Sequence, residues 1–243
     1  MKQKNKHIQN FWKKDSIIYS EFDSKIFKKK IFSVTCKSLN KNILSKYIQK
    51  VEGNCFLNVK TLNFTNQIYS LKKPKINLED LKFVFCFEKK NKIKKNTSNL
   101  NFSTCKINKL DERDKLRVWQ IISEIKNQSR FFKSGLKKEA TKIYKAWMMN
   151  EKFKNFFVTQ KNIILGHIQY LERNKNVIIN LIGIHPKYFN RGIGSIMINK
   201  FLEIIPFEYC YIITKYDNYR VNNFLQKNKF DVAFPFIQFQ IRI

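Results

Sequence analysis

Residues 181–197 read LIGIHPKYFNRGIGSIM, and this stretch predicts a strand, a turn and a helix in close succession. Its apolar start predicts a strand that ends at Ile184, a turn follows to Arg191, and a helix is expected from about Gly194. Half of the chain's 6 glycines lie in it. Glycine lets a backbone approach a ligand closely, and successive N–H groups at a helix start attract phosphate. The stretch therefore predicts a pyrophosphate cradle, with an ordinary strand-to-helix turn as the alternative.

The sequence around this stretch predicts a mixed α/β domain. Apolar periodicity and turn residues indicate the element order β-α-α-β-β-β-α-β-α-β. The strands are expected at 103–107, 156–159, 162–170, 177–184, 209–214 and 236–241. The helices are expected at about 110–125, 137–149, 194–204 and 221–226. Alternation of strands with helices is typical of the α/β class.

The first ninety residues carry shorter β-type patterns. Strands are expected there at 31–35, 55–59 and 81–87. A short helix is expected at 44–51, from apolar residues at helical spacing. Residues 88–101 hold many lysines and asparagines and almost no apolar side chains, so they are predicted to be a linker. We therefore expect a smaller α/β domain at 1–100 and a larger domain at 101–243.

The stretch at 181–197 resembles the acetyl-CoA motif of the GNAT superfamily of acyl-CoA N-acyltransferases. The resemblance implies a GNAT fold for 101–243, with a central mixed, splayed sheet flanked by helices, and an incomplete GNAT-like or substrate- or dimer-related domain before it. It implies acetyl-CoA as co-substrate and no metal. Phe189 stands where the family has Gln or Arg. The implied cofactor-binding residues are Ile182, Gly183, Ile184, Phe189, Asn190, Arg191, Gly192, Ile193, Gly194, Ser195 and Asn218.

A second segment, residues 218–230, resembles the downstream element of the same family. Asn218 matches the residue that contacts CoA. The tyrosine that protonates the departing thiolate falls on Leu225, or on Phe224 with a slip of one residue, and neither has a hydroxyl. The catalytic acid is therefore unknown. Tyr219 or Tyr216 could stand in for it, solvent could supply the proton, or catalysis could be impaired.

A narrower resemblance concerns the substrate. Gln128-Ser129-Arg130-Phe131 and Tyr144-Lys145-Ala146-Trp147 are similar to segments of the dTDP-fucosamine acetyltransferase group. Those enzymes acetylate the 4-amino group of dTDP-4-amino-4,6-dideoxygalactose for envelope polysaccharides such as enterobacterial common antigen. The resemblance implies Arg130, Phe131, Tyr144 and Trp147 as substrate-binding residues. For each of them a structural role is the alternative, and His185 is expected to be a turn residue and not a base.

Other function classes stay open beside this one. They are a GNAT enzyme acting on a protein or peptide amine, a catalytically weakened CoA-binding protein, and a nucleic-acid-binding module. The last is suggested by 48 Lys plus Arg against 18 Asp plus Glu and a net charge of +30. However, 41 of those cations are Lys, and Lys, Asn and Ile are all abundant, as an AT-rich codon supply produces. We therefore expect no specific nucleic-acid partner.

The remaining expectations concern the compartment and the assembly. The chain has 5 cysteines, an odd number without CxxC spacing, which indicates buried free thiols in a reducing compartment. No apolar run has the roughly 20 residues of a membrane span, and no signal peptide is recognisable. A cytoplasmic protein is expected, and a homodimer is possible.

Overall fold

A computed structural model describes residues 15–51, 55–65, 68, 75–90, 99–127 and 137–243. The chain forms two compact units. The first unit comprises 1–85, 214–222 and 232–243, and the second comprises 86–213 and 223–231. The first unit thus includes two segments from the C-terminal part of the chain. The division into independent domains at 1–100 and 101–243 stays a prediction.

The first unit is built on a mixed sheet with strand order β1-β2-β3-β10. Its elements are β1 (Ser16–Tyr19), α2 (Glu21–Phe27), β2 (Lys30–Leu39), α3 (Lys41–Gln49), β3 (Cys55–Phe64) and β10 (Asp231–Arg242), and most of β4 (Lys75–Glu88) also belongs to it. Strands β2 and β3 are parallel, and α3 connects them. Strand β10 is antiparallel to β3. The Asn40 side chain caps α3 by accepting a hydrogen bond from the amide of Ile43 at 2.9 Å.

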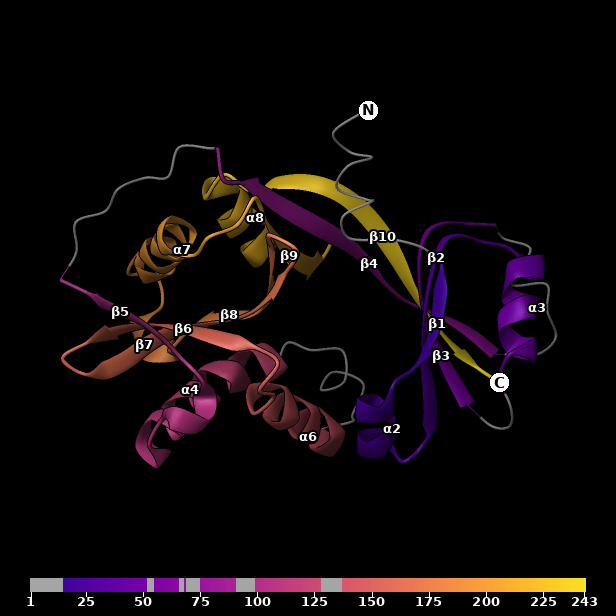
Figure 1. The fold of residues 1–243 in the computed structure, drawn as a ribbon, viewed down its shortest axis with the longest axis horizontal. Coiled ribbons are helices and arrows are strands. Elements are labelled where there is room, and N and C mark those ends of the chain that lie inside the picture. Colours follow the sequence, from indigo (N-terminus) through magenta and orange to yellow (C-terminus); the bar gives the residue numbers. More distant parts are fainter. Residues whose placement is uncertain (1–14, 52–54, 66–67, 69–74, 91–98, 128–136) are drawn as a thin grey trace. The chain divides into compact units, whose positions relative to one another are not determined.

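The core of the first unit lies between α3 and the sheet (Figure 1). Leu44 and Tyr47 of α3 belong to one buried cluster with Val34, Leu57 and Phe239. Residues of β3 alternate between buried and half-buried from Cys55 onward, as a strand with one face on the core requires.

The second unit contains the elements that follow the predicted linker. They are β5 (Asn101–Cys105), the 3₁₀ turn Ile107–Lys109, α4 (Glu112–Asn127), α6 (Lys137–Met148), β6 (Lys154–Gln160), β7 (Ile163–Arg173), β8 (Asn176–Ile184), the 3₁₀ turn Pro186–Tyr188, α7 (Ile193–Ile204), β9 (Tyr209–Lys215) and α8 (Tyr219–Lys227). Strand β9 and helix α8 each have residues in both units.

The sheet of the second unit has the strand order β9-β8-β7-β6-β5. Strands β5 to β8 are antiparallel to their neighbours, whereas β8 and β9 are parallel. Helices α4 and α6 pack together on one face of the sheet, and α7 lies on the opposite face (Figure 1). In α7, the Phe201 ring packs edge-on against Phe156 and Tyr170, at centroid distances of 5.4 and 5.0 Å. The mixed sheet flanked by helices confirms the expected fold class.

Three features escaped the sequence analysis. Strand β1 has only four residues, α2 has seven, and β4 begins at Lys75 where the expected strand began at 81. Elements as short as β1 and α2 carry too few apolar repeats for periodicity to reveal them. The expected linker at 88–101 lies mostly outside the described residues.

The cysteines agree with the expected free thiols. None of the five forms a disulfide, and four of them are buried. Burial raises the pKa of Cys36 to about 11 and that of Cys86 to about 12. These thiols therefore stay protonated near neutral pH. Among the described residues, no helix is long and apolar enough to cross a membrane.

His167 on β7 is a buried neutral histidine. Its Nε2 lies 2.8 Å from Oδ1 of the buried Asn155, and its ring stacks on Phe157 at 5.1 Å. Burial lowers the pKa of His167 from 6.5 to about 3.

We expect the free energy of unfolding to fall as the pH drops from 6.5 toward about 5. In this range the unfolded chain binds a proton at His167 and the folded protein does not, which costs at most about 1.4 kcal/mol per pH unit. His167→Gln keeps a hydrogen-bond donor for Asn155 and removes the titration. Urea unfolding at several pH values should show a shallower loss in the variant. Parallel curves for both proteins would contradict this.

Candidate functional site

The candidate site begins where β8 separates from β9. Parallel pairing runs from Asn176 and Tyr209 to Ile179 and Ile212 and stops there, although β8 continues to Ile184. Leu181 to Ile184 therefore pair on one edge only, with β7, and Asn180 pairs on neither edge. The opposite edge offers backbone groups that an extended ligand could bind as an added strand.

The loop after β8 is held by local hydrogen bonds. The amide of Tyr188 donates to the carbonyl of His185 at 2.9 Å, and the amide of Phe189 donates to the carbonyl of Pro186 at 3.2 Å. Asn190 and Gly192 have positive φ angles of 61° and 74°. A Cβ at Gly192 would meet nothing within 4 Å, so open space lies in front of this residue. The glycine here is required by its left-handed backbone and not by crowding.

The N-terminus of α7 follows at once, and its N-cap residue, Gly192, makes no side-chain hydrogen bond to the first amides. The amides of Ser195 and Ile196 donate to the carbonyl of Gly192, at 3.0 and 3.2 Å. Those of Ile193 and Gly194 belong to the first turn, where a helix offers no acceptor. Together with the helix dipole, these groups form an anion-binding end.

Two arginines lie beside this loop. The Arg117 and Arg191 guanidinium carbons lie 6.0 and 5.5 Å from the centre of the Tyr188 ring. Arg117 also donates from Nε to the carbonyl of Ile164 at 2.8 Å, which fixes it on β7. The sequence analysis singled out Arg191 but missed Arg117, because it comes from α4, far from the motif in sequence.

Two buried asparagines tie α7 to α8, and sequence reasoning missed them as well. Asn199 donates to the carbonyl of Ser195 at 2.8 Å and to Oδ1 of Asn228 at 3.4 Å. Asn228 donates to the carbonyl of Phe224 at 2.7 Å and to Oγ of Ser195 at 3.3 Å. A polar residue within the apolar pattern of α7 was the only available signal. The network fixes the first turn of α7 against the end of α8.

Phe224, not Leu225, is the α8 residue beside the loop. Its ring lies 3.3 Å from where a Cβ of Gly194 would be, whereas Leu225 is fully buried in the core. Neither side chain has a hydroxyl, as the sequence indicated. Asn218 caps α8 by accepting a hydrogen bond from the amide of Val221 at 3.4 Å. Tyr219 is 67% exposed.

His185 is engaged as a turn residue. Its Nε2 lies 3.0 Å from Oε1 of Gln120, and its Nδ1 accepts from the amide of Lys187 at 3.3 Å. The proton must therefore sit on Nε2. Burial, together with Arg117 and Lys187, lowers the pKa of His185. With Nδ1 occupied, the ring has no free acceptor for a substrate proton, which agrees with the expected structural role.

The predicted substrate-binding residues fall into two groups. Arg130 and Phe131 lie outside the described residues. Tyr144 is buried and meets the half-buried Trp147 edge-on at 5.0 Å on α6. The carbonyl of Trp147 accepts a hydrogen bond from Nε2 of Gln169 at 2.8 Å. Among the described residues, no group of three or more His, Cys, Asp or Glu is placed to hold a metal ion.

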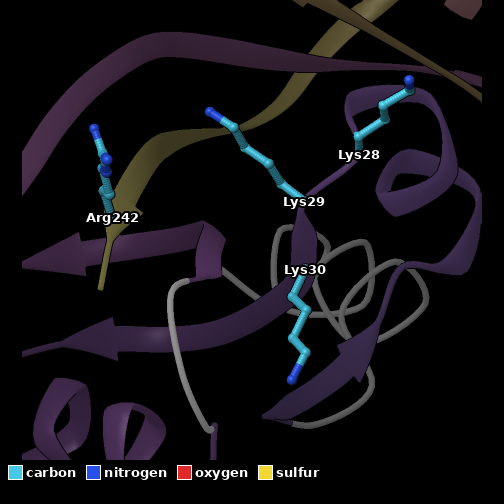
Figure 2. Close-up of a pocket in the computed structure, with 4 residues that line it drawn as sticks. All are labelled: Lys28, Lys29, Lys30 and Arg242. Carbon is cyan, nitrogen blue, oxygen red and sulfur yellow. The ribbon is translucent and has the colours of Figure 1, made fainter.

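The first unit carries an open cavity of about 450 Å³ lined by Lys28, Lys29, Lys30 and Arg242. Figure 2 shows that these side chains do not converge, because Lys30 points away from Lys29 and Arg242. Lys29 Nζ instead lies 4.8 Å from the centre of the Phe56 ring. We therefore do not assign this basic surface a ligand.

Comparison with known proteins finds a family model that matches part of the chain, and this part includes the motif. Residues 119–230 match the acetyltransferase (GNAT) family. No curated protein matches the chain. A functionally unknown conserved protein from Staphylococcus epidermidis ATCC 12228 is 7% identical over 96% of both chains, with a TM-score of 0.62.

Two further solved structures share the fold. A GCN5-related N-acetyltransferase from Kribbella flavida is 5% identical over 99% of this chain and 94% of that one, with a TM-score of 0.53. One from Sphaerobacter thermophilus is 8% identical over 94% and 76%, with a TM-score of 0.54. At these identities the likeness concerns the fold alone.

Asn228 provides a test of the network between α7 and α8. We expect Asn228→Ala to lower the free energy of unfolding by about 1–3 kcal/mol, because it leaves buried partners unpaired. Asn223→Ala changes an exposed asparagine of α8, and its free energy of unfolding should stay within about 0.5 kcal/mol of the wild type. Chemical denaturation of the three proteins measures both effects. Equal stability of the two variants would show that the network contributes little.

Proposed function

We propose that this chain, whose residues 119–230 match the acetyltransferase (GNAT) family, transfers an acetyl group from acetyl-CoA to an amine. The observation that carries the proposal is the edge of β8 left unpaired beyond Ile179. This edge leads into the start of α7, whose first amides have no side-chain cap. An extended arm and a pyrophosphate are the two parts of CoA that such a strand and such a helix end would bind.

The loop residues would hold the pyrophosphate. Backbone groups of Arg191, Gly192, Ile193, Gly194 and Ser195 surround the start of α7, and Phe189 and Asn190 complete the turn before it. The N–H groups of Ile193 and Gly194 supply donors, and the helix dipole favours negative charge. The Arg191 guanidinium beside Tyr188 adds a positive field at the same loop.

The unpaired edge of β8 would bind the pantetheine arm. Backbone groups of Ile182 and Ile184 are its expected partners, with Gly183 between them. A Cβ at Gly183 would lie 2.7 Å from Cγ2 of Ile121, so glycine allows α4 to press against this part of the strand. Helix α4 thus supports the face of β8 beside the free edge.

The reaction itself is a direct transfer. The amine nitrogen attacks the thioester carbonyl, the C–N bond forms, and the C–S bond breaks as the thiolate leaves with CoA. Backbone N–H groups of β8 would polarise the carbonyl. The proton lost by the amine is taken up by the thiolate, through solvent or through Tyr219 as the stand-in acid, because Leu225 and Phe224 cannot supply one.

The acceptor we propose is the 4-amino group of dTDP-4-amino-4,6-dideoxygalactose. The support is the sequence resemblance at 128–131 and 144–147, with Trp147 half-buried on α6. A protein or peptide amine is the second candidate. Binding of CoA by Asn218, a cytoplasmic location and a homodimer belong to the same proposal.

Incubation with acetyl-CoA and each amine, followed by mass spectrometry, tests the acceptor. We expect the sugar nucleotide to gain the mass of one acetyl group and a lysine-containing peptide to remain unchanged. Acetylation of the peptide alone would favour the second candidate. No product from either, with acetyl-CoA shown to bind, would leave only a CoA-binding role.

Gly192 tests the pyrophosphate cradle by charge alone. Asn and Asp have the same shape, and both tolerate the left-handed backbone better than other residues. We expect Gly192→Asp to weaken acetyl-CoA binding at least tenfold relative to Gly192→Asn, because its carboxylate would face the pyrophosphate. Isothermal titration calorimetry measures both dissociation constants. Equal affinities would mean that the phosphates bind elsewhere.

A further inference from the structure

A chain of side-chain amides in the second unit ends where β8 leaves β9. Asn180 is a bulge residue: Gln169 pairs with Leu181 and Tyr170 pairs with Ile179, so Asn180 is skipped by β7. Pairing of β8 with β9 also ends at Ile179. Asn180 is therefore the first residue of β8 with no strand partner on either edge. Bulges recur beside active sites, where they redirect a side chain.

The hydrogen bonds fix which way the Asn180 amide points. The carbonyl of Trp147 can only accept, so the fully buried Gln169 presents its NH₂ group there, at 2.8 Å. The Gln169 oxygen is then left to accept from Nδ2 of Asn180, at 2.7 Å. The amide nitrogen of Asn180 thus points inward. Its Oδ1 points the other way, the residue is exposed, and this oxygen has no hydrogen-bond partner among the described residues.

The position of Asn180 along β8 matches the reacting end of acetyl-CoA. The proposed pantetheine arm starts at α7 and runs back along the strand past Ile184 and Ile182. Asn180 lies two residues further, about 7 Å at the usual rise of a strand. Oδ1 of Asn180 therefore lies at the thioester end of the arm and not at the phosphate end.

We infer that Asn180 binds the acceptor amine, with Oδ1 accepting one of its N–H bonds. This inference rests on the proposed acetyl transfer. The hydrogen bond would hold the nitrogen so that its lone pair faces the thioester carbonyl. Asn180 takes up no proton: the C–N bond forms, the C–S bond breaks, and the amine proton passes through solvent to the thiolate. A neutral oxygen also avoids the stabilisation of the unreactive ammonium that a carboxylate would give.

Steady-state transfer by the full chain tests the inference. The amines used are dTDP-4-amino-4,6-dideoxygalactose, a lysine-containing peptide and a peptide with a free N-terminal amine, and thiol release is measured. For the amine that is acetylated, Asn180→Ala should raise KM about tenfold and leave KM for acetyl-CoA within about twofold. Asn108→Ala is the matched control, because Asn108 is an exposed asparagine with one side-chain bond, to Glu151 at 2.9 Å. It should change neither constant.

Asn180→Asp separates amine binding from a structural role. It keeps an oxygen for the amine and adds a charge that favours the ammonium form, so the pH at which kcat/KM is half-maximal should rise by about one unit. A purely structural Asn180 would leave this pH unchanged in both variants. If the wild type transfers acetyl groups and Asn180→Ala leaves the KM for the amine unchanged, the inference is overturned and the proposed function stands. Absence of transfer to all three amines, with acetyl-CoA bound, would overturn the proposed function and the inference together.

Discussion

The early end of the pairing between β8 and β9 is the constraint on which the site depends. A strand with unpaired backbone groups must satisfy them with water or with a ligand. The chain keeps the free edge of β8 in place from the other sides. Strand β7 pairs with β8 on both sides of Asn180, and α4 presses against Gly183, where any larger residue would collide with Ile121. The same strand then delivers the loop and the start of α7 at a fixed position.

Polar side chains in the second unit hold the backbone at the places where it is irregular. Asn199 and Asn228 fix the first turn of α7, and Gln169 anchors the bulge at Asn180. Each is buried or bonded to a buried partner, so its loss would leave unpaired groups in the interior. Apolar packing alone, such as Phe201 on Phe156, would not select between alternative positions of the loop. The irregular backbone of the site is therefore specified by amides.

The sequence predicted the long elements and the glycine loop because their signals are local. Strand β8, the turn after it and α7 appear in sequence order, and periodicity with two glycines suffices to find them. Three sets of contacts join separate elements, through bonds between residues 11 to 71 positions apart. They are the network of Asn228, the bonds of Arg117, and the amide chain from Trp147 to Asn180. No local pattern encodes such contacts. The +30 charge is conspicuous in the sequence. In the first unit, Lys28, Lys29 and Lys30 contribute to it, and their side chains point in different directions (Figure 2).

The return of β10 to the first unit has a consequence for biogenesis. Residues Ile237 to Arg242 pair with Phe56 to Thr61, a separation of more than 170 residues along the chain. A ribosome releases β3 long before its neighbour β10 has been made, so the sheet of the first unit stays incomplete until β10 has been translated. Contacts this distant also form slowly. Strand β3 is thus synthesised well before it can become fully structured, and it must be protected from aggregation in the interval.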